Sequence, residues 1–102
     1  MANMDAPQFE WDINKNASNE AKHGIGFKTA AYVFADPFNS TISDMSHSDH
    51  EQRWVTIGMV SWKLIVVVHT YPEAPMGAPI RIISSRFAKP AEIRYYERNE
   101  HE

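Results

Sequence analysis

The sequence predicts an α+β domain, with a small twisted antiparallel β-sheet, two N-terminal helices and one C-terminal helix. Three segments, Arg53 to Met59, Lys63 to Thr70 and Pro79 to Arg86, are β-branched or continuously apolar, which is typical of an antiparallel meander. Two upstream segments instead repeat apolar residues at helical spacing. With 102 residues and 43% hydrophobic content, we expect one domain over residues 1–102, with residues 1–8 and 98–102 as flexible ends.

The first predicted elements are a short strand and a capped helix. Phe9-Glu10-Trp11 alternates apolar and polar residues, as a strand does. Asp12 is placed to cap a helix from Ile13 toward His23, and Gly24 is placed to end it. A narrow apolar stripe is predicted along this helix at Ile13, Ala17 and Ala21.

A second short helix should follow. Phe27, Ala30, Ala31 and Phe34 fit the spacing i, i+3, i+4, i+7. We expect this helix to stop before Asp36-Pro37, because the residue before a proline disfavours helical geometry.

The rest of the chain predicts the sheet and a closing helix. Ser40 to Ser43 is a candidate short strand. Leu64 to Val68 is apolar on both faces and should therefore be a central strand. A tight turn around Val60-Ser61-Trp62 joins two of the strands. Pro90 fits the first position of the closing helix.

Composition limits the classes of function. The chain has no cysteine, which excludes disulfides, thiol catalysis and Cys-ligated zinc. It has no apolar stretch resembling a signal peptide or a membrane span, so we expect a cytoplasmic protein without membrane contact. The net charge is −3, but residues 52–102 carry seven Lys or Arg against five acidic residues. A local cationic face can attract RNA despite a negative total.

Several short motifs occur in a fixed order along the chain. They are Phe9-Glu10-Trp11-Asp12, Asn19 with Lys22-His23-Gly24, Val33-Phe34-Ala35-Asp36-Pro37, Glu51-Gln52-Arg53, Ile57-Gly58, Ile80 to Arg86, and Glu92 with Tyr96-Glu97. This ordered set resembles the BrnT family of toxins. The resemblance implies a RelE-like fold and a small endoribonuclease of a type II toxin–antitoxin module. It also implies a BrnA-like ribbon-helix-helix antitoxin as the partner, with operator DNA contacted only through that antitoxin.

Cleaving RNA without a metal requires cations that stabilise the phosphorane. The candidate cations are Lys22, Arg53 and Arg86, and we prefer Arg86 because it ends its strand, where it can reach a phosphate. The structural alternative for each is an ion pair. In a regular strand Arg86 shares a face with Ile80, Ile82 and Ser84, while Arg81 points to the other face. Both arginines could then serve one site only if a bulge intervened.

The reaction also needs a group that accepts the proton of the 2′-hydroxyl. His23 and Glu51 are the preferred candidates. His69 follows an aliphatic strand, where a histidine is more often a hydrogen-bonded core residue. Glu51 lies two residues before Arg53, so the two side chains should share a strand face. That pairing could position the arginine or be purely structural.

The sequence also contains candidate metal ligands and candidate base-stacking residues. Asp44, His47, Asp49 and His50 are chemically able to bind zinc or manganese, but they lie in one short polar loop without a rigid scaffold. We therefore expect neither a metal nor a cofactor. Aromatic residues that could stack on bases, or could equally be core or interface residues, are Trp54, Trp62 and Tyr71.

The sequence thus favours a metal-independent endoribonuclease toxin that cleaves RNA, inhibits growth and is neutralised by a cognate antitoxin. The predicted catalytic residues are Lys22, His23, Glu51, Arg53 and Arg86. The alternative is a non-catalytic binding module whose cationic sheet face docks an acidic protein or nucleic acid.

Overall fold

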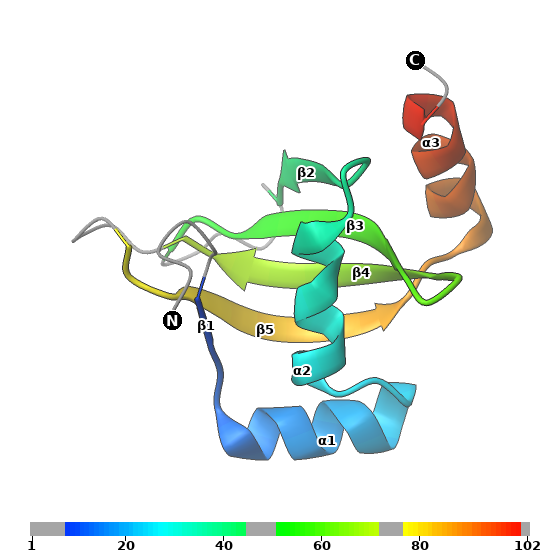
Figure 1. Ribbon diagram of the computed structural model, residues 1–102. Coiled ribbons are helices and arrows are strands. Elements are labelled where there is room, and N and C mark those ends of the chain that lie inside the picture. Colours follow the sequence, from blue (N-terminus) through cyan, green and yellow to red (C-terminus); the bar gives the residue numbers. More distant parts are fainter. Residues whose placement is uncertain (1–7, 45–50, 72–76, 101–102) are drawn as a thin grey trace, which may run out of the picture.

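The computed structural model describes residues 8–44, 51–71 and 77–100 (Figure 1). The predicted α+β class is confirmed, with every predicted strand and helix present in the predicted order. The elements are β1 (Phe9–Glu10), α1 (Ile13–His23), α2 (Phe27–Ala30), the 3-10 helix η1 (Ala31–Ala35), β2 (Ser40–Ser43), β3 (Trp54–Val60), β4 (Lys63–Thr70), β5 (Ile80–Phe87) and α3 (Pro90–Glu100).

The five strands of the described segments form one sheet in the order β1-β5-β4-β3-β2. Strands β2 to β5 are antiparallel, as predicted, and β4 is central. The sheet is nevertheless mixed, because β1 pairs parallel to β5, with Phe9 opposite Ile80. The direction of a two-residue strand is set by its pairing partner, so the residues of the strand itself do not predict it.

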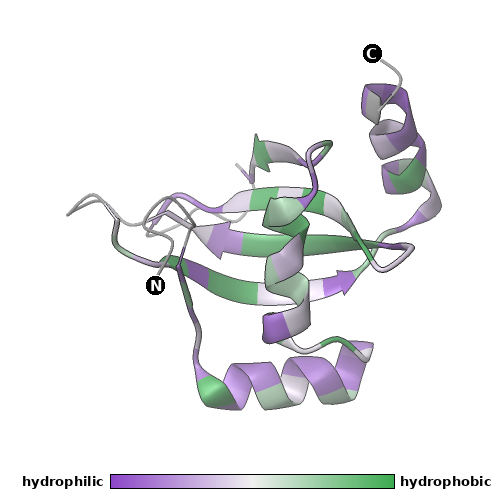
Figure 2. Cartoon of the chain, viewed as in Figure 1, coloured by the Kyte–Doolittle hydropathy of each residue, from purple (hydrophilic) through white to green (hydrophobic). Residues whose placement is uncertain are grey.

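The two faces of the sheet are covered unequally. Helix α2 and η1 pack on the face that carries Ile65, Val67 and Ile82, which we call the closed face, and α1 lies along the β5 edge of the sheet. The other face, which we call the open face, carries Val66 and Ile57 and is met by α3 through Tyr96. In Figure 1, η1 crosses the sheet, whereas α3 leaves it at the end where β5 finishes. Figure 2 shows that the middle of β3 and β4 is apolar while α1 and α3 are mostly hydrophilic.

Helix α1 begins and ends as the sequence predicts. The Asp12 carboxylate accepts hydrogen bonds from the backbone N–H groups of Asn14 and Lys15, which lowers its pKa. Gly24 ends the helix in the left-handed conformation, with φ of 79°.

The predicted apolar stripe of α1, however, is not its buried face. Ile13 is 76% exposed, and the helix buries Asn19 instead. Helical spacing locates an apolar stripe but cannot reveal a polar side chain whose hydrogen bonds permit its burial.

Asn19 completes the edge of the sheet. Its carboxamide oxygen accepts the backbone N–H of Ser85 at 3.1 Å, and its amide nitrogen donates to the Ser85 carbonyl at 2.9 Å. The same nitrogen also contacts the Ser85 hydroxyl and the carbonyl of Ile25. The side chain therefore acts as a substitute strand beside β5, where β1 pairs with Ile80 and Arg81 and extends no further.

The second helical segment stops before Pro37, as predicted, with its last turn tightened into η1. The N-terminus of α2 is capped from another helix, because the Asn16 carboxamide accepts the backbone N–H of Phe27 at 2.7 Å. Gly58 lets η1 approach β3 closely. A Cβ atom there would lie 2.7 Å from the backbone oxygen of Val33.

Candidate active site

A β-bulge places two arginines of β5 on the same face. Arg81 pairs with Thr70 and Arg86 pairs with Val66, but the register shifts between Val68 and His69, so Ile83 is an extra residue in β5. Cross-strand partners point to the same face, and Thr70 and Val66 share the open face by alternation. The expectation that Arg81 and Arg86 point to opposite faces, which assumed a regular strand, is therefore wrong.

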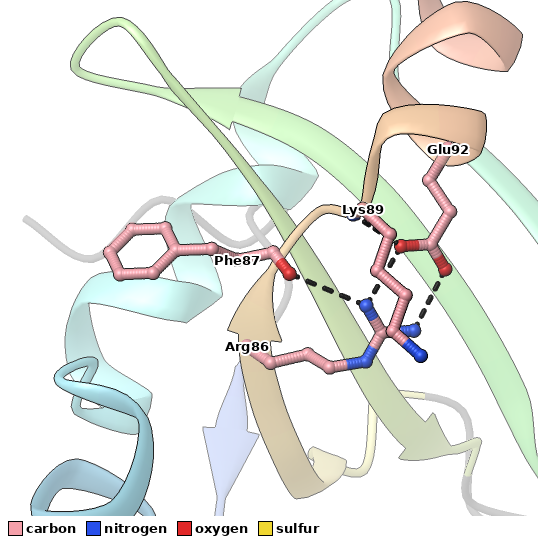
Figure 3. Close-up of polar contacts among 4 residues, drawn as sticks. All are labelled: Arg86, Phe87, Lys89 and Glu92. Carbon is pink, nitrogen blue, oxygen red and sulfur yellow. Dashed lines mark hydrogen bonds and ion pairs between the residues drawn. The ribbon is translucent and has the colours of Figure 1, made fainter.

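Arg86 is held in a two-pronged ion pair with α3 (Figure 3). Its Nη1 and Nη2 atoms donate to the two carboxylate oxygens of Glu92 at 2.8 and 2.7 Å. Glu92 also accepts the backbone N–H of Lys89 at 2.8 Å. The bidentate hydrogen bonds raise the pKa of Arg86 and lower that of Glu92. Arg86 therefore joins the end of β5 to the first turn of α3.

Arg81 is held much more loosely. Its Nη1 atom lies 3.7 Å from Oε1 of Glu10, and the two side chains are 44% and 50% exposed. Such an exposed pair contributes little to stability and leaves the guanidinium accessible to solvent.

Arg53 lies in the same row across the sheet as Arg81. The backbone N–H of Asp44 donates to the Arg53 carbonyl at 2.9 Å, which extends the β2–β3 ladder by one residue. Arg53 precedes Trp54, the partner of His69 on the closed face, so alternation places Arg53 on the open face opposite Thr70. The two arginines flank Thr70 at two strand spacings, about 10 Å between Cα positions. We call Arg53, Thr70 and Arg81 the arginine row.

The five residues predicted to be catalytic fall into three places. Glu51 is exposed and lies just before Arg53, at the end of the sheet that carries the arginine row. Arg86 lies at the opposite end of β5, beside α3. Lys22 and His23 form the last turn of α1, which lies along the β5 edge of the sheet. The structure thus groups Glu51 with Arg53, and it separates both from the other three.

His69 is a buried core residue, as its position in the sequence favoured. Its Nε2 atom is hydrogen-bonded to the Thr56 hydroxyl at 2.7 Å, and Thr56 contacts the Thr41 hydroxyl at 2.6 Å. The ring lies edge-on to Phe34 and Tyr71. Burial lowers its pKa to about 4, so the imidazole is neutral at physiological pH.

Helix α3 is attached to the sheet by a second polar contact. The Asp36 carboxylate accepts the Tyr96 hydroxyl at 2.6 Å and the backbone N–H of Met59 at 2.7 Å. Burial raises the pKa of Asp36, but the hydrogen bonds from Tyr96, Met59 and Phe38 outweigh it and leave that pKa lowered. Asp36 and Tyr96 therefore anchor α3 to the end of η1 and to β3.

The candidate metal ligands lie mostly beyond the described part of the chain. Three of the four, His47, Asp49 and His50, fall outside the described residues. Within the described residues, no group of three His, Cys, Asp or Glu side chains is close enough to hold a metal ion. No helix in the described segments is long and apolar enough to cross a membrane.

Sequence reasoning did not include Arg81 among the candidate site residues, because the face on which it lies depends on the bulge. The signal that could have revealed the bulge is the pair of adjacent serines, Ser84-Ser85. Both interrupt the apolar pattern of the strand, and of the two Ser85 is buried, where Asn19 binds it.

Comparison with known families identifies the chain. A search of curated proteins gave no match. A family model described as "Ribonuclease toxin, BrnT, of type II toxin-antitoxin system" matches residues 11–92, which include α1, all of β2 to β5 and the arginine row. The chain therefore belongs to the BrnT family of ribonuclease toxins of type II toxin–antitoxin systems.

Proposed function

We propose that this protein is a metal-independent endoribonuclease that cleaves RNA at the arginine row. The observation that carries the proposal is that Arg53 and Arg81 flank the Thr70 position on one open sheet face. Two guanidinium groups at this spacing can reach the non-bridging oxygens of one phosphodiester from both sides. Guanidinium forks suit phosphate oxygens and carry their charge at any physiological pH.

In this mechanism the 2′-hydroxyl of the RNA attacks the adjacent phosphorus atom. The Glu51 carboxylate accepts the proton of that hydroxyl, and Arg53 and Arg81 stabilise the negative charge that develops on the phosphorane. The bond from phosphorus to the 5′-oxygen then breaks. The leaving 5′-oxygen takes up one proton from water, so the products are a 2′,3′-cyclic phosphate and a 5′-hydroxyl.

The remaining predicted residues have supporting roles in this proposal. Arg86 is a positioning residue, since its bidentate pair with Glu92 fixes α3 beside the open face. Lys22 and His23 lie on the last turn of α1 and would contact the RNA chain away from the bond that is cleaved.

The family membership also supports a cellular role. We expect the protein to act in the cytoplasm, to inhibit growth when it is produced alone, and to be neutralised by a cognate antitoxin that covers the open face. A BrnA-like ribbon-helix-helix antitoxin would link the toxin to operator DNA.

The test is RNA cleavage by purified protein in excess EDTA, with analysis of the product ends. We expect cleavage to persist and to leave 2′,3′-cyclic phosphate ends. Arg53→Ala and Glu51→Gln should each lower the rate about 100-fold, a typical cost of removing one transition-state contact. The matched control is Arg94→Ala, an exposed arginine of α3 outside the arginine row.

Two results would contradict the proposal. Activity that is lost in EDTA and restored by zinc or manganese would show a metal-dependent reaction. Folded protein that binds RNA or an acidic partner but cleaves no RNA would favour the non-catalytic binding module.

A further inference from the structure

The β3–β4 hairpin ends in a strained turn. Val60 pairs with Lys63, so the loop contains only two residues, Ser61 and Trp62. Their φ angles are 47° and 72°, which are the left-handed values of a type I′ turn. This turn normally takes Asn-Gly, because residues with a larger side chain are strained at positive φ. Tryptophan is therefore costly at this position.

The strained turn presents its tryptophan to solvent. Trp62 is 95% exposed, the highest value among the large apolar residues of the described segments. A residue that is both strained and exposed adds nothing to the core, so the fold gives no reason for its presence.

Lys63, which follows Trp62 in the chain, packs against an aromatic ring. The ammonium group of Lys63 lies 5.3 Å from the ring centroid of Phe87, and that ring is 44% exposed. Phe87 ends β5 on the closed face, where it pairs with Ile65. We call Trp62, Lys63 and Phe87 the hairpin patch.

Cationic side chains gather around the hairpin patch, and the Asp36 carboxylate, which accepts the backbone N–H of Met59 and lines the same hollow as Ser61, also lies nearby. Lys89 follows β5 at this end of the sheet and is exposed. The carboxylate of Glu92, in the first turn of α3, is neutralised by Arg86. The last turn of α1, with Lys22 and His23, lies at the same end of the molecule in Figure 1.

We propose that the hairpin patch is a binding subsite for single-stranded RNA, in which a base stacks on Trp62 and Lys63 contacts the adjacent phosphate. Exposed aromatic rings beside cations are the general means of holding single-stranded nucleic acid. An apolar protein partner would need the aromatic rings but not the lysines beside them. This inference rests on the proposed function, because it assigns a second contact for the same RNA substrate.

The subsite is remote from the arginine row. Trp62 lies at the tip beyond Val60 and Lys63, whereas Arg53 and Arg81 lie at the opposite end of the sheet. RNA that reaches both places must run the length of the sheet on the open face and pass around the hairpin tip to Phe87 on the closed face, which takes several nucleotides. The patch should therefore affect binding of long oligomers and leave short ones unaffected.

The experiment measures binding of a fluorescent 2′-O-methyl oligoribonucleotide of about 12 nucleotides, which lacks the attacking hydroxyl and cannot be cleaved. Trp62→Gly should weaken binding about ten-fold, within the range for loss of one stacked base. Glycine suits positive φ, so the same substitution should keep or raise the melting temperature. Trp62→Tyr should retain most of the affinity, and binding should quench the tryptophan emission of the wild type more than that of Trp62→Tyr.

The control is Tyr95→Ala, which removes another exposed ring, 41% exposed, from α3. This variant is expected to bind the oligomer like the wild type. Lys63→Ala should reduce the salt dependence of binding by about 0.7 in the log–log slope, the value for one phosphate contact on a single strand.

Each outcome decides between the two proposals. Equal binding by Trp62→Gly and the wild type, with RNA cleavage intact, would overturn the subsite and leave the proposed function standing. Wild-type protein that neither binds the oligomer nor cleaves RNA would overturn both. Unchanged RNA binding by Trp62→Gly with weakened binding of the antitoxin would show that the patch is a protein interface instead.

Discussion

Strand β5 faces two different environments, and the comparison separates residues that hold the fold from residues available for chemistry. On the closed face, Ser85 is buried and is bound by the Asn19 carboxamide through both its backbone groups and its hydroxyl. On the open face, Arg81 contacts Glu10 at 3.7 Å with nearly half of its side chain in solvent. Arg86 is on the open face too, but its bidentate ion pair with Glu92 gives it a structural role, like that of Ser85 on the closed face. The number and geometry of partners therefore predict the role better than the residue type does.

The largest effect on stability should come from Asn19→Ala. The change leaves the buried backbone N–H of Ser85 and the carbonyls of Ser85 and Ile25 without their partner. We expect the free energy of unfolding to fall by about 3 kcal/mol, the penalty for several unpaired buried polar groups. Chemical denaturation measures it, and Asn14→Ala on the exposed side of α1 is the control. Equal stability of the two variants would show that the contacts of Asn19 with Ser85 on the closed face do not hold the fold more strongly than exposed contacts do.

Arg81→Ala should lower activity and leave stability nearly unchanged, whereas Asn19→Ala is expected to lower stability. We expect the rate of RNA cleavage to fall about 100-fold, because a cation that stabilises the phosphorane is lost. The melting temperature should change little, since the pair with Glu10 is exposed. Arg81→Lys should recover part of the rate by restoring the charge without the guanidinium fork. An active Arg81→Ala beside an inactive but stable Arg86→Ala would place the site at the α3 end of the sheet.

The closed face should also respond to acid through His69. Burial lowers the pKa of His69 from the ordinary histidine value of 6.5 to about 4, so the unfolded chain binds the proton first as pH falls. This contribution to stability is therefore fully present above pH 6.5 and is lost as the pH falls to about 4. Between pH 7 and pH 5 the loss should be about 2 kcal/mol. His69→Gln should flatten this part of the profile of unfolding free energy, and an unchanged slope would show that other groups cause it.

The smallest expected effect is that of Arg86→Ala on stability. Loss of the bidentate pair should lower the free energy of unfolding by about 1 to 2 kcal/mol, because both side chains are about two-thirds buried. Cleavage should fall less than in Arg81→Ala. Denaturation of Arg86→Ala, Glu92→Gln and the double variant gives the coupling energy, and a coupling near zero would mean that the pair does not anchor α3.

The sequence patterns predicted the elements well because each depends on local residues. Asp12 and Gly24 bound α1, Pro37 follows the end of η1, and Lys63 to Thr70 was predicted with the limits that β4 has. Three features escaped prediction because they depend on distant partners. The burial of Asn19 needs Ser85, the direction of β1 needs β5, and the bulge at Ile83 is defined only against β4.

The candidate site was predicted only in part, because one of its residues depends on a distant partner and the others do not. Glu51 and Arg53 are neighbours in sequence, and the structure keeps them together. Arg81 joined the site only once the bulge was known, since regular alternation assigns it to the other face.

The parallel pairing of β1 with β5 has a consequence for synthesis of the toxin. Glu10 leaves the ribosome before its partner Arg81, which lies in β5, the strand inserted between β1 and β4. A nascent chain that stops before Ile80 has neither the second arginine of the row nor the strand that completes the sheet. Under the proposed mechanism, newly made polypeptide is therefore harmless to its own ribosome until β5 has been translated, which leaves that interval for the antitoxin to be in place.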